Sequence, residues 1–488
     1  MATIEEIDVY VQLQLKLGDV KTKNASTNRV TTLKHPQRST ILKLLQAVRR
    51  FQAGQDPRWI AVLGLRGVGK TTMLSQLFQN IRTDQHRKLF VALDDAKDSL
   101  DIGVRDIATA YERTLGMRFE ELTEPVYLFF DEIHFDPQWA LSLKALVDRS
   151  PYIFIVMTGS SVSEINKTLD SATSRRVLSQ TLHPMSFTEF RLLEEHKTFG
   201  RASGGLGMKI RQLLYESESA EEVYNGLLSL RPKVMDYWAD ITPNKRQARI
   251  DKYMSYANLP FTLTYANNKE YIYQLIEQTL SIIINKDFRA TYDFTNDTLG
   301  KIKLVLRSIA NSSTLSMKSL ADTYDIDRTI LTKVMDALEK ASVLQRIHPH
   351  AMPGKQAKKP SKYLFVSPAY RSMFFNYIGS VLPYDSYKGY LLEDTVGLYL
   401  SILTKQNVPT LAGLSVTYDS AENGADFVLS TDSRKICIEV GYGAKKPNQA
   451  NATKLRHKCV YGLTVCSAPL KLSSNSLTVP LSYFLLTA

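Results

Sequence analysis

The feature that most constrains the fold is a glycine-rich turn within WIAVLGLRGVGKTTMLSQL, residues 59–77. It fits the pattern G-x-x-x-x-G-K-[ST] in full, at Gly64, Gly69, Lys70 and Thr71. The apolar run 60–63 before the turn predicts a buried parallel strand, and apolar residues at helical spacing after Lys70 predict a helix. A strand, a tight turn and a helix in this order favour an α/β domain.

The residue types in this turn suit a phosphate group. Glycines let backbone N–H groups curl around an anion without Cβ clashes, and the positive end of the following helix points at the same place. We expect Lys70 to reach the β- and γ-phosphates and the hydroxyl of Thr71 to bind Mg²⁺. The predicted cofactors are therefore ATP and Mg²⁺, held by Gly64, Gly67, Gly69, Lys70, Thr71 and Thr72. The alternative is an ordinary turn that contains a lysine.

A pair of acids, Asp131 and Glu132, follows the apolar run 126–130. Parallel α/β sheets place their ligands at the carboxyl ends of buried strands. Asp131 is suited to hold Mg²⁺ directly or through water, and Glu132 is suited to polarise the attacking water. The alternative is that adjacent acids simply begin a loop.

Other predicted strands surround this pair. The strand 153–157 ends at Thr158, which either senses the γ-phosphate or caps a helix. The strand 89–95 comes after the glycine-rich turn and before Asp131, so we expect a strand to separate the turn from the acids. The next strand is predicted at 177–182.

The order of these segments resembles a known family. Along the chain, the segments that carry the resemblance are, in order, GLRGVGKTT, LDD, YLFFDEIHFDPQW, IVMTGSS, SRRV, PMSFTEF, LPFTLTY, IINKDF and ICIEVGYGAKK. From about Arg50 it is similar to prokaryotic AAA-like P-loop ATPases that carry a winged helix and a C-terminal restriction-nuclease-like domain of unknown function. In this family an arginine after the sensor strand often completes a neighbour's site. The resemblance thus implies a catalytic role for Arg175 and Arg176 in a homo-oligomer, unless they only solvate a loop.

The resemblance also implies the fold class and its division. We expect an α/β fold with an AAA-type core around a parallel sheet, a helical lid, a winged helix-turn-helix and a C-terminal α/β nuclease-like domain. The predicted bounds are 1–50 for an N-terminal arm or helix, 51–185 for the core, 186–298 for the lid, 299–375 for the winged helix and 387–488 for the last domain. A lid of this kind transmits the nucleotide state by moving against the core.

The predicted winged helix carries a local excess of positive charge. No acid lies between Lys340 and Val381, and the whole chain has 61 basic against 49 acidic residues, a net charge of +12. We expect DNA backbone contacts from four lysines of the wing, Lys355, Lys358, Lys359 and Lys362. Asp336 and Glu339 on the preceding helix weaken a base-specific interpretation. The alternative is a winged helix that binds protein.

The last domain contains three acids in an order typical of restriction-type nucleases. A second Mg²⁺ site is possible at Glu393, Asp426 and Glu439. The lysine expected after the last acid is replaced by Gly441, although Lys445 or Lys446 follows in the next loop. We therefore expect a degenerate domain used for binding or assembly, with an intact nuclease as the alternative.

The distribution of apolar residues and cysteines argues against a membrane protein, a secreted protein and a zinc protein. The sequence lacks an uncharged apolar run of about 18 residues and a secretory signal, so we expect a cytoplasmic protein without a membrane span. The spacing of its three cysteines argues against zinc and a disulfide framework. The expected function is Mg²⁺-dependent ATP hydrolysis that drives a switch or remodelling step coupled to DNA. The alternatives are an ATP-regulated nuclease effector in defence against foreign DNA and a protein-assembly switch without nucleic acid.

Overall fold

The fold was analysed in a computed structural model of the chain. The structure describes residues 2–28, 32–160, 177–195, 204–265, 268–312, 314–351, 359–376, 382–405, 411–443, 448–473 and 476–488. The chain divides into two compact units, 1–183 with 340–342, and 184–339 with 343–488. Each unit is described by itself.

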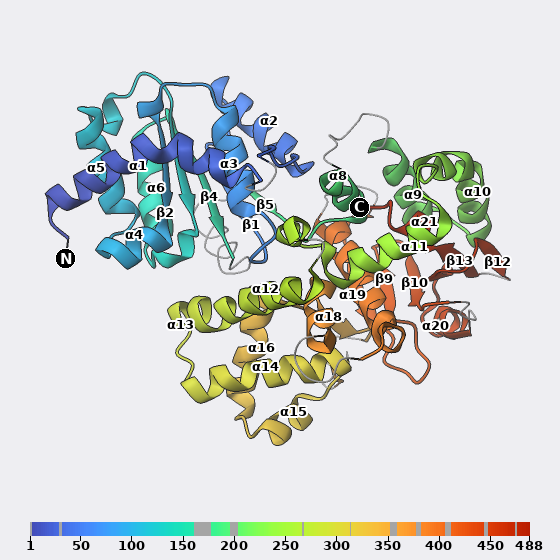
Figure 1. The fold of residues 1–488 in the computed structure, drawn as a ribbon. Coiled ribbons are helices and arrows are strands. Elements are labelled where there is room, and N and C mark those ends of the chain that lie inside the picture. Colours follow the sequence, from blue (N-terminus) through green and yellow to red (C-terminus); the bar gives the residue numbers. More distant parts are fainter. Residues whose placement is uncertain are drawn as a thin grey trace. The chain divides into compact units, whose positions relative to one another are not determined.

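The first unit is built on a parallel sheet (Figure 1). Its strands in the described residues are β1 (Trp59–Leu63), β2 (Lys88–Ala92), β3 (Val126–Asp131), β4 (Ile153–Gly159) and β5 (Val177–Thr181). They lie in the order β2-β3-β4-β1-β5, all parallel. Every residue of β1, β3 and β4 is buried, as expected for strands covered on both faces. The helices are α1 (Ile4–Ala25), α2 (Thr40–Gln52), α3 (Lys70–Asn80), α4 (Leu93–Leu100), α5 (Val104–Leu115) and α6 (Trp139–Arg149).

The strand order corrects one detail of the sequence analysis. A strand does separate β1 from β3, but it is β4, whereas β2 lies at the edge of the sheet beside β3. The predicted strand 89–95 is also too long at its end. It stops at Ala92, and Asp94 and Asp95 belong to the first turn of α4. Strand order depends on contacts between distant segments, which local patterns do not specify.

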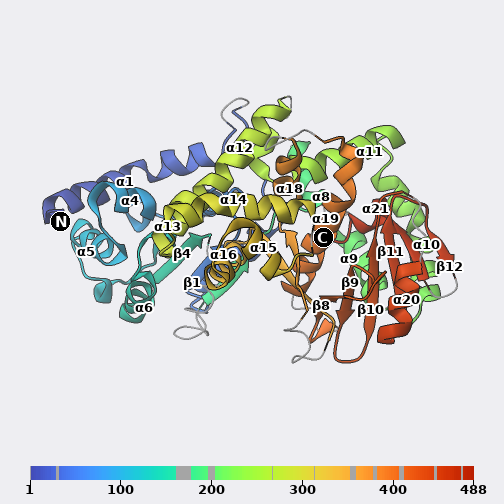
Figure 2. The same ribbon diagram turned by 90° about the horizontal axis from the view of Figure 1, so that it is seen from below.

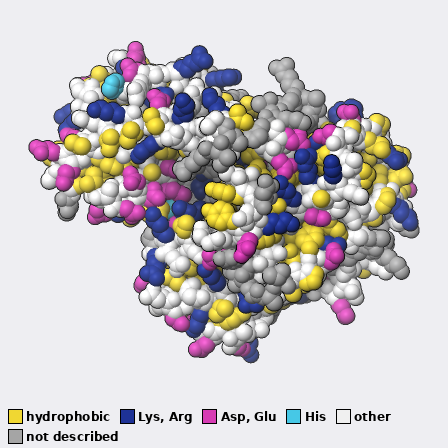
Figure 3. Space-filling view, in the orientation of Figure 1, with side chains coloured by type: hydrophobic (Ala, Val, Ile, Leu, Met, Phe, Trp, Pro, Cys, Tyr) yellow, Lys and Arg dark blue, Asp and Glu magenta, His cyan; other side chains and the backbone are white. Residues whose placement is uncertain are grey.

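The N-terminal segment is part of the first unit. We predicted residues 1–50 as a separate arm or helix, but α1 packs on α3, α5 and β2. Val11 and Leu15 are buried in the same apolar cluster as the strands, and Arg113 binds both carboxylate oxygens of Asp8. Outward-facing apolar side chains lie along the same helix (Figure 3); Val9, for example, is 65% exposed.

The second unit begins with helices. They are α8 (Phe187–Glu194), α9 (Gly204–Glu216), α10 (Ala220–Tyr237), α11 (Pro243–Lys252), α12 (Lys269–Ile282) and α13 (Phe288–Thr291), followed by α14 (Asn296–Asn311), α15 (Met317–Tyr324) and α16 (Arg328–Lys340). The helical pattern predicted for 186–298 agrees with these bounds. Ser186 directly precedes α8 and caps it. Its hydroxyl accepts a hydrogen bond from the N–H of Glu189 in a capping box.

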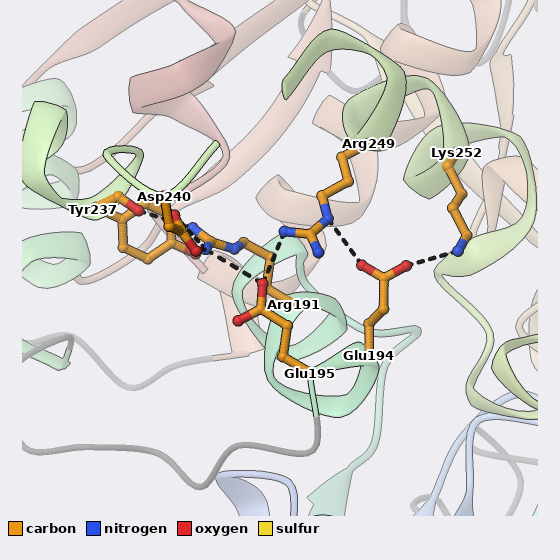
Figure 4. Close-up of polar contacts among 7 residues, drawn as sticks. All are labelled: Arg191, Glu194, Glu195, Tyr237, Asp240, Arg249 and Lys252. Atoms are coloured by element: carbon orange, nitrogen blue, oxygen red, sulfur yellow. Dashed lines mark hydrogen bonds and ion pairs between the residues drawn. The ribbon is translucent and has the colours of Figure 1, made fainter. Parts of the chain in front are cut away.

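An ion network ties α8 to α10 and α11 (Figure 4). It comprises Arg191, Glu194, Glu195, Tyr237, Asp240, Arg249 and Lys252. Arg191 donates to both oxygens of Asp240, at 3.0 and 2.8 Å, and to the carbonyl of Tyr237 at 2.9 Å. Arg249 and Lys252 on α11 both pair with Glu194, the last residue of α8, and Arg249 also pairs with Glu195, which directly follows it. Arg191 is buried and its guanidinium lies over the ring of Tyr237, so this one side chain joins α8 to the end of α10.

The remaining elements of the second unit form a large sheet with helices. They are β6 (Leu344–Pro349), β7 (Lys362–Phe365), α18 (Pro368–Asn376), α19 (Tyr384–Lys405), β8 (Ser415–Tyr418), β9 (Phe427–Ser430), β10 (Lys435–Val440), α20 (Asn448–His457), β11 (Tyr461–Cys466), β12 (Lys471–Ser473), β13 (Ser476–Pro480) and α21 (Leu481–Phe484). The strand order is β12-β13-β11-β10-β9-β8-β6-β7. Figure 2 shows these strands side by side, with α20 next to them.

The hairpin β6–β7 belongs to this same sheet. Three helices, α14 to α16, precede the hairpin in the segment predicted as a winged helix, and that assignment stays a prediction. The hairpin joins the C-terminal strands through parallel pairing of β6 with β8, at His348 with Thr417 and Pro349 with Tyr418. The sheet therefore continues across the boundary that we predicted between residues 375 and 387.

A buried ion pair fixes α18 to α19. The guanidinium of Arg371 and the carboxylate of Asp394 are both fully buried, and two hydrogen bonds of 2.6 and 2.9 Å join them. Arg371 also donates to the carbonyls of Ile309 and Ala310 at the end of α14. One arginine thus connects the three-helix segment to the C-terminal helices.

Candidate nucleotide-binding site

The glycine-rich turn between β1 and α3 forms an open backbone cradle. Gly67 and Gly69 have φ of 86° and 93°, in the left-handed region that favours glycine. At Gly64 a Cβ atom would lie 2.2 Å from the carbonyl oxygen of Leu182, so another residue cannot fit without moving the backbone. The helix α3 then begins at Lys70, and its N-terminus faces the cradle as predicted.

The lysine of the turn is folded over the loop. Lys70 is 5% exposed, and its Nζ donates to the carbonyls of Gly64 at 2.9 Å and Leu65 at 3.3 Å. Arg38, from the N-terminal segment, is also buried and donates to the carbonyl of Val68 at 3.0 Å. Sequence analysis missed Arg38, since no motif connects it to a turn 26 positions further on, at Gly64.

Three predicted residues meet at the ends of β3, β4 and the loop. The hydroxyl of Thr71 donates to Oδ2 of Asp131 at 2.7 Å, and the hydroxyl of Thr158 donates to Oδ1 of the same carboxylate. The hydroxyl oxygen of Thr158 in turn accepts a hydrogen bond of 3.0 Å from the backbone N–H of Glu132. Thr158 therefore orients the acid pair. Residues 161–176, where a helix capped by Thr158 would lie, are outside the described residues. Its role as a γ-phosphate sensor stays a prediction.

The carboxyl of Asp131 has an unusual pKa. Burial raises the pKa to about 6, and the neighbouring charge of Glu132 adds to the rise. The hydroxyls of Thr158 and Thr71 and the ammonium of Lys70 oppose this effect without cancelling it. A carboxylate kept in a buried site at this energetic disadvantage is typical of a position that a cation will fill.

Glu132 lies in a strained backbone conformation, with φ of 51°. Its side chain is 13% exposed and lies 3.8 Å from the guanidinium of Arg66 and 3.5 Å from Nδ1 of His134. Burial lowers the pKa of His134. Sequence analysis named neither neighbour, although one occupies a variable position of the loop motif and the other follows Glu132 by two positions.

This arrangement fits a magnesium-bound nucleoside triphosphate. Hard cations of this kind prefer carboxylate and hydroxyl oxygens, which Asp131 and Thr71 supply 2.7 Å apart. The cradle offers backbone N–H groups and a buried ammonium for the phosphates. Thr72, the last predicted contact, follows in the first turn of α3. The predicted residues Arg175 and Arg176 lie outside the described residues.

Two of the carboxylates predicted to bind a second metal ion are instead paired with the ammonium of a lysine. Lys362, from β7, hydrogen-bonds Glu393 on α19 and Oδ1 of Asp426, the latter at 3.1 Å. Glu439 on β10 is 1% exposed. The described residues contain no group of three or more acidic, histidine or cysteine side chains arranged to hold a metal ion. The alternative lysines Lys445 and Lys446 lie outside the described residues.

Lys362 also corrects the predicted DNA contacts. Its side chain is 7% exposed and its ammonium is taken by two carboxylates, so it is not available to a phosphate group. Lys355 and Lys358 lie outside the described residues. Lys359 is exposed and donates to the hydroxyl of Ser420. In a strand, alternate residues face inward, and the sequence did not show on which side of β7 the lysine falls.

Comparisons with known proteins identify the domain in which this candidate site lies. Residues 56–191 match the sequence model of the AAA domain, which contains the cradle, Asp131 and Thr158. The first unit thus carries a P-loop ATPase domain of the AAA type. The chain belongs to the same family as the uncharacterized protein MJ1637 of Methanocaldococcus jannaschii, to which it is 32% identical over 448 residues, 91% of this chain and 88% of the relative.

Solved structures also match. A Walker-type ATPase of Pyrococcus abyssi is 11% identical with a TM-score of 0.40, and covers 71% of this chain and 97% of its own. The RuvB Holliday junction branch migration motor of Thermotoga maritima is 15% identical with a TM-score of 0.30, and covers 66% and 93%. In the described part of the chain, no helix combines the length and apolar character that a membrane crossing needs.

Proposed function

We propose that this protein binds ATP with Mg²⁺ and hydrolyses it. The observation that carries the proposal is the shared hydrogen bonding of Asp131 with Thr71 and Thr158, which joins the phosphate cradle to the strand ends. Asp131 and Thr71 hold the metal, and Lys70 neutralises the phosphates. When bound, Mg²⁺ neutralises charge that develops on the γ-phosphate. Glu132, next to the metal carboxylate, orients the attacking water and accepts its proton.

We further propose that the ATPase cycle is a switch or remodelling step coupled to DNA. Two acids on α16, Asp336 and Glu339, are both paired with Arg346 on β6. Arg346 therefore offsets one of these two negative charges within the domain, and Arg328 and Lys333 are exposed on the same helix. Together with the acid-free segment between residues 340 and 381, this favours a polyanion as the partner.

The test is ATP turnover by the full chain with and without duplex DNA. Lys70→Ala is expected to abolish nucleotide binding, which makes it the control for all ATP-dependent signals. The combined change Lys355→Ala, Lys358→Ala and Lys359→Ala is expected to remove DNA stimulation and to reduce the salt dependence of DNA binding. The matched control is Lys43→Ala with Lys144→Ala, two exposed lysines of the first unit. Stimulation that survives loss of these three lysines would contradict their role in DNA binding. A wild-type protein whose ATP turnover does not respond to duplex DNA would contradict the coupling to DNA, and neither result bears on ATP hydrolysis itself.

A further inference from the structure

Lys362 is a buried cation of the second unit that takes no part in the proposed ATP site. This side chain comes from β7 of the hairpin, yet its ammonium lies among residues of the C-terminal strands and α19. Beside the two carboxylates it contacts the backbone carbonyl of Asp426 at 3.4 Å. A lysine that is almost fully buried is rare unless it is paired, so its position has a specific cause.

The surroundings keep this lysine charged. Its Nζ lies 5.6 Å from the ring centre of Tyr418 and 5.4 Å from that of Phe427. Burial by itself lowers the pKa of Lys362, but the charges of Glu393 and Asp426 outweigh burial and hold the pKa above its ordinary value. The ammonium is therefore a permanent positive charge inside this domain.

The two carboxylates are held by the same cation although they come from different elements. Glu393 lies on α19, and Asp426 directly precedes β9. The second oxygen of Asp426 accepts the N–H of Val440 at 2.8 Å, which fixes the carboxylate against β10. Removing the ammonium would leave the carboxylates of Glu393 and Asp426, which are 10% and 23% exposed, facing one another without a counter-charge.

We propose that Lys362 is the resident cation of the C-terminal domain, where its ammonium takes the place that a divalent cation would occupy between Glu393 and Asp426. The native domain then needs no metal at this position. The same contact joins the hairpin to the C-terminal strands. Lys362 is on β7 and Asp426 directly precedes β9, so the two residues come from opposite sides of the β6–β8 pairing. This proposal is independent of the ATPase activity.

The test counts bound Mn²⁺ on the full chain without nucleotide, by electron paramagnetic resonance of the free ion. Lys362→Met keeps the apolar stem and removes the charge. It is expected to bind one Mn²⁺ more than the wild type, and the extra ion is lost in Lys362→Met with Asp426→Asn. Any weak binding at the nucleotide site is the same in all three proteins and cancels.

Thermal unfolding gives a second measurement. At ten times its dissociation constant, Mn²⁺ is expected to raise the melting temperature of the second unit in Lys362→Met by about 2 °C, with no such shift in the wild type. Folding of each variant is checked by circular dichroism. A folded Lys362→Met that neither binds nor is stabilised by Mn²⁺ would overturn the proposal.

The wild-type protein provides an outcome that does not depend on the folding of the lysine variant. Wild type and Asp426→Asn are expected to bind equal amounts of Mn²⁺, because the native carboxylates are already occupied. A manganese ion bound by the wild type and lost in Asp426→Asn would show that Lys362 shares the site with a metal, and the proposal would be wrong.

Discussion

Replacing Asp131 by asparagine is expected to stabilise the nucleotide-free protein at neutral pH while it impairs nucleotide binding. The pKa of this carboxyl is raised from 3.8 to about 6, first because it is buried and then because Glu132 is negative. The folded state consequently binds a proton more tightly than the unfolded chain does. At neutral pH the buried carboxylate is charged and opposes folding, whereas an amide is neutral.

The size of the effect follows from the shift. A rise of about two units corresponds to roughly 3 kcal/mol, since one unit is worth about 1.4 kcal/mol. The asparagine has only one oxygen for the hydroxyls of Thr71 and Thr158, and one hydrogen bond must reverse or be lost, at about 1 kcal/mol. We therefore expect the free energy of unfolding to rise by about 2 kcal/mol at pH 7.5.

The pH dependence has a defined sign. Below about pH 4 both states of the wild type carry the proton, so Asp131 no longer opposes folding. The stability that this proton contributes is lost as the pH rises from about 4 to about 6, and the loss is constant above that. The advantage of Asp131→Asn is thus expected to be smaller at pH 5 than at pH 7.5.

Urea unfolding followed by tryptophan fluorescence measures this difference. Trp59 and Trp139 lie in the core of the same unit, and a Trp238→Phe background removes the signal of the other unit. With ATP and Mg²⁺ at 100 times the dissociation constant, the wild type gains about 2.7 kcal/mol and overtakes the variant. A variant less stable than the wild type at pH 7.5 without nucleotide would refute the reasoning.

Four further substitutions separate the roles of single residues. Glu132→Gln is expected to retain ATP affinity while single-turnover hydrolysis falls by about 10²- to 10⁴-fold; unchanged hydrolysis would exclude it as the base. Gly64→Ala places a methyl group 2.2 Å from the carbonyl of Leu182, and calorimetry should show at least about tenfold weaker ATP binding, since the cradle must distort. Arg371→Met leaves a buried carboxylate unpaired and should reduce the unfolding free energy of the second unit by about 3–5 kcal/mol. The matched change Arg346→Met, in a partly exposed ion pair, should reduce it by about 1 kcal/mol or less, and equal losses would contradict the role of burial.

The arrangement of the candidate nucleotide site could be predicted from the sequence because its residues lie in short segments with recognisable patterns. The spacing of Gly64, Gly69 and Lys70 fixes one turn, and the apolar runs before Asp131 and Thr158 fix two strand ends. Parallel strands then bring those ends together at one edge of the sheet, without further information.

Other parts depend on contacts between distant positions. The packing of α1 on the sheet, and Arg38 on the cradle, join segments whose local patterns are those of any amphipathic helix or loop. The sequence placed Lys362 in an exposed basic wing because its neighbours are basic. Only the register of β7 shows that its side chain turns inward to Glu393 and Asp426.

The shared sheet limits how this protein can be dissected. A fragment ending near residue 376 would contain the helices α14 to α16 and the hairpin, but it would leave β6 as an unprotected strand edge and Lys362 without its counter-charges. The complementary fragment would expose the edge of β8. Expression of either piece alone is therefore a poor substitute for the intact second unit, and fragments prepared for binding studies should begin no later than Thr295, which caps α14, and run to residue 488.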